Sequence, residues 1–178
     1  FIGGNLIRYL INSNYKVLNL DKLTYAADKK SLKYFNKQKN YRFEKVDISN
    51  YKKISEIITS YKPNKIINLA AESHVDRSIE SSKQFVKSNI MGTTSLLEAS
   101  LKFHKKNKLK NFLFHHVSTD EVYGDLEENK HKSFKETTNY DPGNPYSASK
   151  ASADHFVKSW QKTYNLPTII SNCSNNFG

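Results

Sequence analysis

The chain has 178 residues, which is enough for one globular domain with a buried core. Hydrophobic residues make up 37% and aromatic residues 12% of it, which excludes a disordered protein. The formal net charge of +11 would suit a nucleic-acid partner, but it comes almost entirely from lysines scattered over predicted helices and loops. We therefore expect no nucleic-acid partner.

Cysteine usage and hydropathy bear on the compartment. The single cysteine, Cys173, excludes an internal disulfide and favours a reducing compartment, so we expect a cytoplasmic protein. No apolar run is long enough to cross a bilayer, and we expect no membrane partner. The chain opens on Phe1 without a methionine and stops at Gly178, which indicates a fragment of a longer protein.

Hydrophobic periodicity predicts alternating helices and strands. In chain order we expect a helix over Gly3–Asn14, a strand over Val17–Asp21, a polar loop with one short helix over Asp21–Asn40, a strand over Tyr41–Val46, a helix over Tyr51–Tyr61, a strand over Lys65–Leu69, a loop over Ala70–Ser81, a helix over Ser82–Lys106, a strand over Asn111–Ser118, a loop over Gly124–Asn144, a helix from Pro145 to about Tyr164 and a strand over Pro167–Asn172. This alternation is typical of one α/β domain with a parallel sheet covered on both faces. Ligands of such sheets bind beyond the carboxyl ends of the strands, where Asp21, Asp47, Ala70, Thr119 and Cys173 fall.

The first helix and strand carry a partial dinucleotide signal. Gly3 could be the last glycine of a phosphate-binding turn, and Asp21 ends a strand at the distance where an acid binds the ribose hydroxyls. An Asp at a strand end is also a common turn former, so the spacing alone leaves both interpretations open. An acid at this position would repel a 2'-phosphate and favours NAD over NADP.

Tyr146 and Lys150 lie four residues apart in a predicted helix and therefore share one face. A nearby ammonium stabilises a phenolate and lowers the tyrosine pKa, so the two side chains could remove a proton from a substrate hydroxyl. A Tyr and a Lys at this spacing are also common without any function. The small residues around them, Ser147, Ala148, Ser149 and Ala151, leave room for a large ligand against the helix.

Thr119, Asp120 and Glu121 follow the predicted strand that ends near Ser118. Acids in such a place usually form a helix cap or a solvated turn. They could instead act as a general acid beside a general base, which an elimination of water requires. His74, His115 and His116 have no accompanying acid or cysteine cluster, and neighbouring residues of a strand point to opposite faces. We therefore predict structural histidines and no metal.

Four stretches together resemble the extended short-chain dehydrogenase/reductase superfamily and, within it, the dTDP-glucose 4,6-dehydratase family. They are Asp21–Ala26, Leu69–Ile79, Ser118–Asp125 with the downstream Tyr146–Lys150 motif, and Asn172–Gly178. The resemblance covers essentially the whole chain. It implies a doubly wound, parallel Rossmann-type sheet, with residues 1–178 forming a partial NAD-binding domain that lacks the first, central strand and the C-terminal substrate domain.

The resemblance also implies roles for the candidate residues. Tyr146 would deprotonate the glucose C4 hydroxyl, Lys150 would hold the nicotinamide ribose, Thr119 would bind the C4 oxygen, Glu121 would remove the C5 proton and Asp120 would protonate the departing C6 hydroxyl. Substrate contacts match Ser73, Thr119 and Asn175. NAD contacts match Phe1, Ile2, Asp21, Lys22, Leu23, Thr24, Asp47, Ile48, Leu69, Ala70, Ala71, Glu72, Ser73, Ser88, Tyr146, Lys150 and Asn176.

The resemblance also bears on the stability of the fragment and on its partners. Without a central strand, we expect a slot between the strands that begin at Val17 and Lys65, with unpaired backbone on both sides, and an inactive, aggregation-prone fragment. A homodimer is implied through the helices at Ser82–Lys106 and Pro145–Tyr164. The alternatives are another NAD-dependent nucleotide-sugar epimerase or decarboxylase, and an NAD-binding protein without turnover.

Overall fold

The structure is a computed structural model that describes residues 1–27, 29–126 and 133–176. Its strands are β1 (Val17–Asp21), β2 (Tyr41–Lys45), β3 (Lys65–Asn68), β4 (Leu113–Thr119) and β5 (Thr168–Cys173). Its helices are α1 (Ile2–Asn12), α2 (Lys29–Phe35), α3 (Tyr51–Tyr61), α4 (Val75–Glu80), α5 (Lys83–Phe85), the π-helical turn η1 (Val86–Met91), α6 (Gly92–Asn107), the 3₁₀ turn η2 (Asp120–Tyr123) and α7 (Pro145–Tyr164). This alternation confirms the predicted α/β class.

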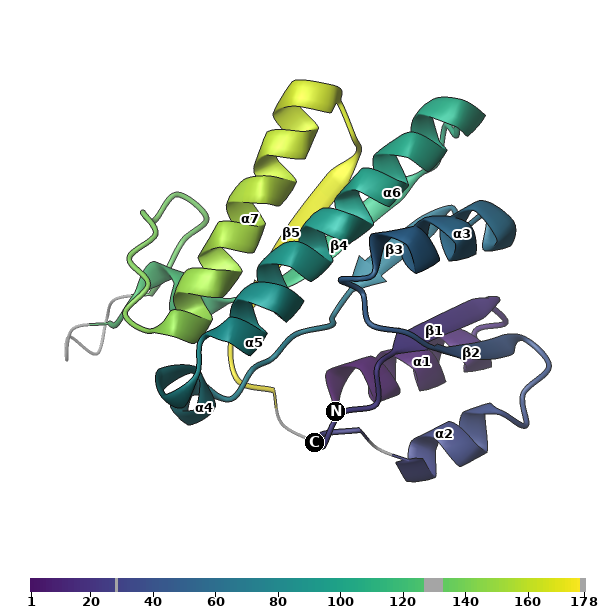
Figure 1. Cartoon of the computed structure of the whole chain (residues 1–178), viewed down its shortest axis with the longest axis horizontal. Coiled ribbons are helices and arrows are strands. Elements are labelled where there is room, and N and C mark those ends of the chain that lie inside the picture. The colour runs from purple at the N-terminus through teal and green to yellow at the C-terminus, as the bar shows by residue number, and fades with distance from the viewer. Residues whose placement is uncertain (28, 127–132, 177–178) are drawn as a thin grey trace.

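All strand pairs in the described residues are parallel. β1 pairs with β2, with Val17 opposite Tyr41. β4 lies between β3 and β5, so that Phe114 is opposite both Ile66 and Thr168. Figure 1 shows α3, α6 and α7 side by side over the β3–β4–β5 sheet, while α1 packs on β1. Every described strand therefore ends at the same edge of its sheet, as the sequence predicts.

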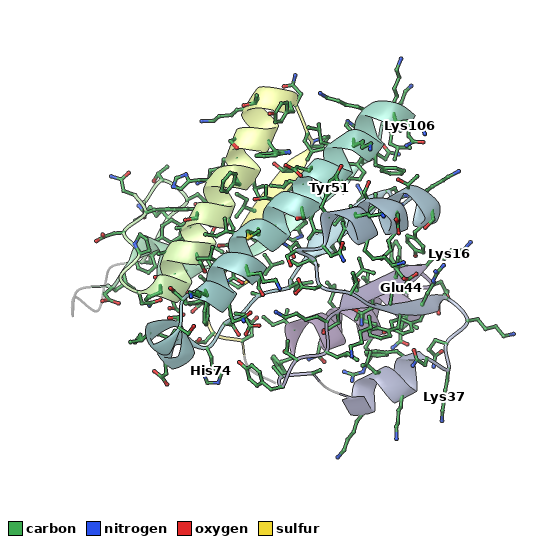
Figure 2. All side chains as sticks on the ribbon, in the orientation of Figure 1. Lys16, Lys37, Glu44, Tyr51, His74 and Lys106 are labelled. Atoms are coloured by element: carbon green, nitrogen blue, oxygen red, sulfur yellow. The ribbon has the colours of Figure 1, made fainter. Side chains whose placement is uncertain are left out.

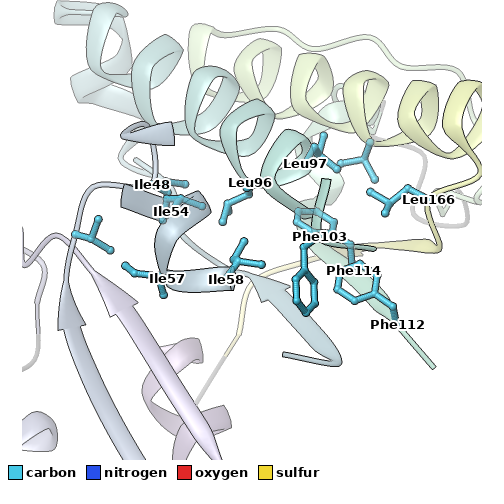
Figure 3. Close-up of a cluster of buried hydrophobic side chains, with 13 residues drawn as sticks. Ile48, Ile54, Ile57, Ile58, Leu96, Leu97, Phe103, Phe112, Phe114 and Leu166 are labelled. Carbon is cyan, nitrogen blue, oxygen red and sulfur yellow. The ribbon is translucent and has the colours of Figure 1, made fainter. Parts of the chain in front are cut away.

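The main core lies between these three helices and the sheet. α3 contributes Ile54, Ile57 and Ile58 at helical spacing, and all three are buried. They belong to one cluster with apolar side chains of α6, of β4 and of the residue just before β4, and Figure 3 shows Leu96, Leu97, Phe103, Phe112 and Phe114 among them. β4 alternates half-buried and buried residues, which seats its buried face against α7. This packing fixes the strand end that carries Thr119.

The bounds of α1, β2, β3, β4 and β5 differ from the sequence predictions by one or two residues at an end, and two regions differ more. The segment Ala70–Ser81, which we expected to be a loop, contains the helix α4. Its polar sequence gives no sign of burial, yet Ser78 is buried, and Ser78 Oγ donates to the Val75 carbonyl at 2.6 Å. The helix expected over Ser82–Lys106 is interrupted by η1, a π-helical turn whose backbone hydrogen bonds span five residues instead of four. By contrast, α3 and α7 have the predicted bounds, and Asn144 caps α7 in a reciprocal capping box with Ser147.

The predicted slot is confirmed. β1 pairs only with β2, and β3 only with β4, so in the described residues neither strand is paired along its other edge. A cavity of about 1430 Å³ lies there and runs from Val17 and Lys65 to Asp21 and Leu69. Unpaired strand edges recruit other chains. The aggregation of an isolated 178-residue polypeptide stays a prediction.

The lysines and the apolar segments of the described chain agree with the sequence predictions on charge and hydropathy. Figure 2 shows Lys16, Lys37 and Lys106 pointing outward from separate parts of the chain, in keeping with lysines that are spread rather than clustered. Within the part of the chain that the structure describes, no helix has the length and apolar character needed to cross a membrane.

Candidate active site

The turn after β4 presents the Thr–Asp–Glu motif. Thr119 caps η2, because its Oγ1 accepts a hydrogen bond from the Glu121 backbone N–H at 3.3 Å. The same hydroxyl lies 3.4 Å from Asp120 Oδ1 as a donor. Val122 and Tyr123 are buried and fasten the turn, whereas the two acids remain half-buried. The helix-cap interpretation of this motif therefore holds for Thr119, while the carboxylates of Asp120 and Glu121 keep part of their surface exposed.

The first turns of α7 bring Tyr146 and Lys150 to this motif. Both side chains are buried, with 8% and 4% of their surface exposed. Tyr146 is hydrogen-bonded to the Thr119 side chain. The Lys150 ammonium donates to the Val117 carbonyl of β4 at 2.7 Å. The structure thus places the phenol, the ammonium and the Thr–Asp–Glu motif around one site.

The pKa of Tyr146 departs from the sequence expectation. Burial raises it, and the charges of Glu121, Asp120 and Asp154 raise it further, while the hydrogen bond with Thr119 opposes them. The expected lowering by Lys150 is not found, because the ammonium is turned to the Val117 carbonyl instead. The first turns of α7 contact η2, the turn that carries Asp120 and Glu121.

Lys150 carries an ionisable group in a buried position. Burial lowers its pKa to about 8, and the Asp154 and Cys173 side chains oppose that lowering. An ammonium in this setting stays protonated near neutral pH only with help from neighbouring negative charge. Asp154 was not singled out from the sequence, although it lies four residues beyond Lys150 and therefore on the same helical face.

The predicted cofactor residues of the first half of the chain gather at the carboxyl ends of β1 and β3. Asp21 Oδ1 accepts from the Leu23 backbone N–H at 2.6 Å, and its carboxylate is exposed. Lys22 Nζ lies 2.9 Å from Glu72 Oε1 and donates to Ser88 Oγ at 2.7 Å. These contacts join the edge of β1 to the segment after β3 and to η1.

Asp47 is held as an anion at the same edge. Burial alone would raise its pKa, but hydrogen bonds from the Ser49 N–H and hydroxyl, together with the Lys22 and Lys87 ammonium groups, lower it. Ile48 beside it is buried and contacts Gly92, where an added Cβ would come within 2.6 Å of the Ile48 side chain. A larger residue at position 92 would therefore force the Ile48 side chain to move.

Asn89 connects the two parts of the site. Its side chain accepts from the Glu72 N–H at 2.9 Å, donates to the Glu72 carbonyl at 3.0 Å, and donates to Ser149 Oγ of α7 at 2.8 Å. It is 1% exposed and lies in η1. Asn89 was not predicted as a site residue, because an Asn inside a predicted helix gives no signal of a long-range role. Its contacts place the cofactor edge next to the Tyr146 site.

The remaining predicted residues either line the cavity between β1 and β3 or lie outside it. The cavity lining includes many of the expected NAD contacts: Phe1, Asp21, Lys22, Leu23, Thr24, Asp47, Ile48, Leu69, Ala70, Ala71 and Ser88. The other expected NAD contacts are not among its lining residues: Ile2, Glu72, Ser73, Tyr146, Lys150 and Asn176. Asn175 and Asn176 are exposed after β5, whereas Asn172 donates to the Thr119 carbonyl at 3.1 Å. Phe177 and Gly178 lie outside the described residues.

The histidines of β4 have separate partners. His115 is hydrogen-bonded to Ser171 Oγ at 2.8 Å, and His116 lies on the opposite face, 3.2 Å from Asn68 Nδ2. Within the ranges that the structure describes, no group of three or more His, Cys, Asp or Glu side chains is arranged to hold a metal. The two histidines thus point to opposite faces as predicted, and the absence of a metal stays a prediction.

Comparison with known proteins assigns the family. Residues 1–178 match the family described as GDP-mannose 4,6 dehydratase, and the chain belongs to it. A dTDP-glucose 4,6-dehydratase of Neisseria gonorrhoeae is 50% identical over 182 aligned residues, which cover 100% of this chain and 52% of that protein. The predicted resemblance to dTDP-glucose 4,6-dehydratases is thereby confirmed, and the chain spans about half the length of such relatives.

Solved structures share the fold. The dTDP-glucose 4,6-dehydratase of Streptomyces venezuelae, determined with NAD bound, is 34% identical and superimposes with a TM-score of 0.90 over 100% of this chain and 54% of that one. UDP-glucose 4-epimerase of Thermotoga maritima, determined with UDP-glucose, is 26% identical with a TM-score of 0.85 over 100% of this chain and 53% of that one. These matches confirm the Rossmann-like parallel architecture.

Proposed function

We propose that the protein converts dTDP-glucose to dTDP-4-keto-6-deoxyglucose and water, with NAD as a tightly held cofactor. One observation carries the proposal: Tyr146, which can accept a hydroxyl proton, is hydrogen-bonded to Thr119 and lies next to the paired acids Asp120 and Glu121. The residue that would assist oxidation of the sugar and the acid–base pair that would eliminate water then belong to the same site. The relatives named dTDP-glucose 4,6-dehydratase support this proposal.

The chain's own residues fit NAD. The exposed carboxylate of Asp21 suits ribose hydroxyls, and it would repel a 2'-phosphate. Asp47, Ile48 and the Leu69–Ala71 segment line the same cavity, and Lys150 would face the nicotinamide ribose. When bound, NAD would accept a hydride from C4 of the glucose and return it to C6, so that it ends unchanged.

The first step would take place at C4. Tyr146 would receive the proton of the C4 hydroxyl as that carbon is oxidised to a ketone, and Thr119 would hold the C4 oxygen through its hydroxyl. A buried tyrosine with a raised pKa is a poor base by itself. The Lys150 ammonium, one helical turn away, would turn from the Val117 carbonyl toward Tyr146 to stabilise the phenolate once it forms.

The ketone makes the C5 hydrogen acidic, and the acid pair would then act. Glu121 would take the C5 proton, the bond from C6 to its hydroxyl would break, and Asp120 would give that hydroxyl the proton with which it leaves as water. C6 is then reduced and C5 regains a proton, which yields the 4-keto-6-deoxy sugar. Each carboxyl needs the opposite starting charge, as a general acid and a general base do.

A homodimer and a cytoplasmic location complete the proposal. Val86 and Met91 of η1 and Phe156 of α7 are 44%, 55% and 38% exposed, and they lie on the two helices expected to pair. Exposed apolar side chains on neighbouring helices support an interface between copies. A nucleotide-sugar substrate and a single free cysteine, Cys173, fit the cytoplasm.

The test uses a protein that carries residues 1–178 at the full length of the relatives. Incubated with dTDP-glucose, it should form a product that has lost water and that absorbs after treatment with alkali. UDP-glucose tested in parallel reports on the nucleotide base. An epimerised sugar of unchanged mass would favour the epimerase alternative, and NAD binding without any product would favour a non-catalytic protein.

A further inference from the structure

A third carboxylate, besides those of Asp120 and Glu121, lies near the Tyr146–Lys150 pair, and the proposed chemistry does not use it. Asp154 is eight residues beyond Tyr146 and four beyond Lys150, so the three side chains follow one another along the same face of α7. Asp154 has 0% of its surface exposed. A fully buried carboxylate costs free energy unless hydrogen bonds or an opposite charge compensate it.

Three groups from outside α7 surround this carboxylate. Oδ2 accepts a hydrogen bond from Ser118 Oγ of β4 at 2.7 Å and another from the Tyr140 hydroxyl at 3.0 Å. Oδ1 lies 3.4 Å from His116 Nε2, and neither of these two atoms has a hydrogen-bond partner within the described structure. Because both donors are hydroxyl groups that point at Oδ2, the geometry suits an ionised carboxylate.

The contact with His116 is not an ion pair. Burial and the charges of Lys150 and His115 hold the pKa of His116 well below its usual range, so the imidazole is neutral. Asn68 Nδ2 donates toward His116 Nδ1 at 3.2 Å and also toward Thr93 Oγ1 at 3.1 Å. His116 Nε2 then carries the proton and faces Asp154. The cation that balances Asp154 must come from elsewhere.

Lys150 is the cation that the placement favours, because it lies one helical turn before Asp154 on the same face of α7 and is buried like it. Burial raises the pKa of Asp154 and lowers that of Lys150, and each group opposes the shift of the other. The remaining ionisable groups around Asp154 are His116 on β4, Tyr123 on η2, Tyr140 in the preceding loop, and Tyr146 and Lys158 on α7. Lys158 is exposed and donates to the Tyr140 hydroxyl at 3.2 Å. Only Lys150 combines a positive charge with deep burial.

We propose that Asp154 is a positioning residue for the Tyr146–Lys150 site, which fixes α7 on β4 through Ser118 and supplies the buried negative charge that keeps Lys150 an ammonium. Its catalytic consequence rests on the proposed function, but its electrostatic consequence does not. Without Asp154 the Lys150 side chain would lose its proton closer to neutral pH and could no longer stabilise a phenolate.

The test compares Asp154→Asn with Asp141→Asn in the full-length protein. Both changes remove one carboxylate, and Asp141 is exposed in the loop before α7. Lysine labelled with ¹³C at Cε is titrated by NMR, and the Lys150 signal is identified by its absence in Lys150→Arg. It should titrate near pH 8 in the parent and in Asp154→Asn at a pH lower by about one unit or more. An unchanged titration in Asp154→Asn would overturn the proposal.

Activity gives a second readout. If the parent forms the dehydrated product, the alkaline limb of kcat/KM should move to lower pH by about one unit in Asp154→Asn, with about a tenfold loss above the limb, and stay in place in Asp141→Asn. A uniform loss at every pH would indicate a purely structural role and overturn the proposal. If the parent forms no product, the proposed function fails, while the NMR titration still decides the role of Asp154.

A folding defect would not leave the question open. Asp154→Asn leaves a buried, unbalanced ammonium, and Lys150→Met removes that charge at similar length. If Asp154→Asn does not fold, the double variant with Lys150→Met should regain a cooperative thermal transition, because the unbalanced charge is gone. A double variant that also fails to fold would mean that Asp154 acts through packing alone, and the proposed charge balance would be wrong.

Discussion

The two halves of the molecule are built to different standards of packing. In the β3–β4–β5 half, α3, α6 and α7 cover the sheet, and Phe114 and Val157 are fully buried. In the β1–β2 half, every residue of β1 is at least partly exposed, and a large cavity follows its unpaired edge. The proposed chemistry lies in the first half, where side chains are held from several sides. The expected cofactor contacts are divided between the two halves, with those at Asp21–Thr24 and at Asp47 in the second.

This difference suggests a division of labour. Tyr146 and Lys150 must be held within fractions of an ångström of a reacting carbon, and a packed helix on a central strand provides that rigidity. Asp21 and Asp47 only have to bind a ligand that brings many contacts of its own. Substitutions should therefore have steep effects in the first half and shallow ones in the second.

The largest expected effect is at Tyr146. Tyr146→Phe keeps the ring beside Phe85 but removes the hydroxyl that would take the C4 proton, so kcat should fall by about 10²–10⁴-fold with little change in Tm. Steady-state assays and thermal unfolding measure the two quantities. A variant that keeps more than about a tenth of the activity would remove the tyrosine from the proposed mechanism.

The sequence predicted much of this first half and less of the second. α7 could be bounded from Asn144 and Pro145 because a cap and a fixed φ are local properties. Tyr146 and Lys150 were visible because helical spacing puts them on one face. Asn89, His116 and Asp154 were not recognised as a group, since their contacts join positions tens of residues apart in the chain. The predicted lowering of the Tyr146 pKa was wrong, because residue spacing reveals neither the burial of a side chain nor the direction in which an ammonium group points.

Core substitutions should sharpen the contrast in stability. Phe114→Ala empties a site with 0% exposure in the centre of the sheet and should lower the free energy of unfolding by about 3–5 kcal/mol. Leu20→Ala, in the partly exposed β1, should cost about 1–2 kcal/mol because less apolar area is lost from the core. Urea denaturation of both variants measures the costs. Equal costs would contradict the proposed difference in packing.

The smallest expected effect is at Asp21. Asp21→Asn keeps an acceptor for the Leu23 N–H but removes the charge that would bind the ribose hydroxyls, so NAD affinity should fall by about tenfold or less. The same change should narrow the preference for NAD over NADP, because the repulsion of a 2'-phosphate is lost. Calorimetric titration with both dinucleotides measures this, and an unchanged ratio would place the cofactor elsewhere.

The most direct test of the account asks whether Glu121 acts on the same sugar that Tyr146 helps to oxidise. In a single turnover of dTDP-glucose, Glu121→Gln should still reduce the bound NAD, because C4 oxidation does not need the acid pair, yet it should release no dehydrated product. Absorbance of the reduced cofactor and mass spectrometry of the sugar follow the two events. Dehydration by this variant at the parent rate, or the loss of C4 oxidation together with dehydration, would contradict the assignment.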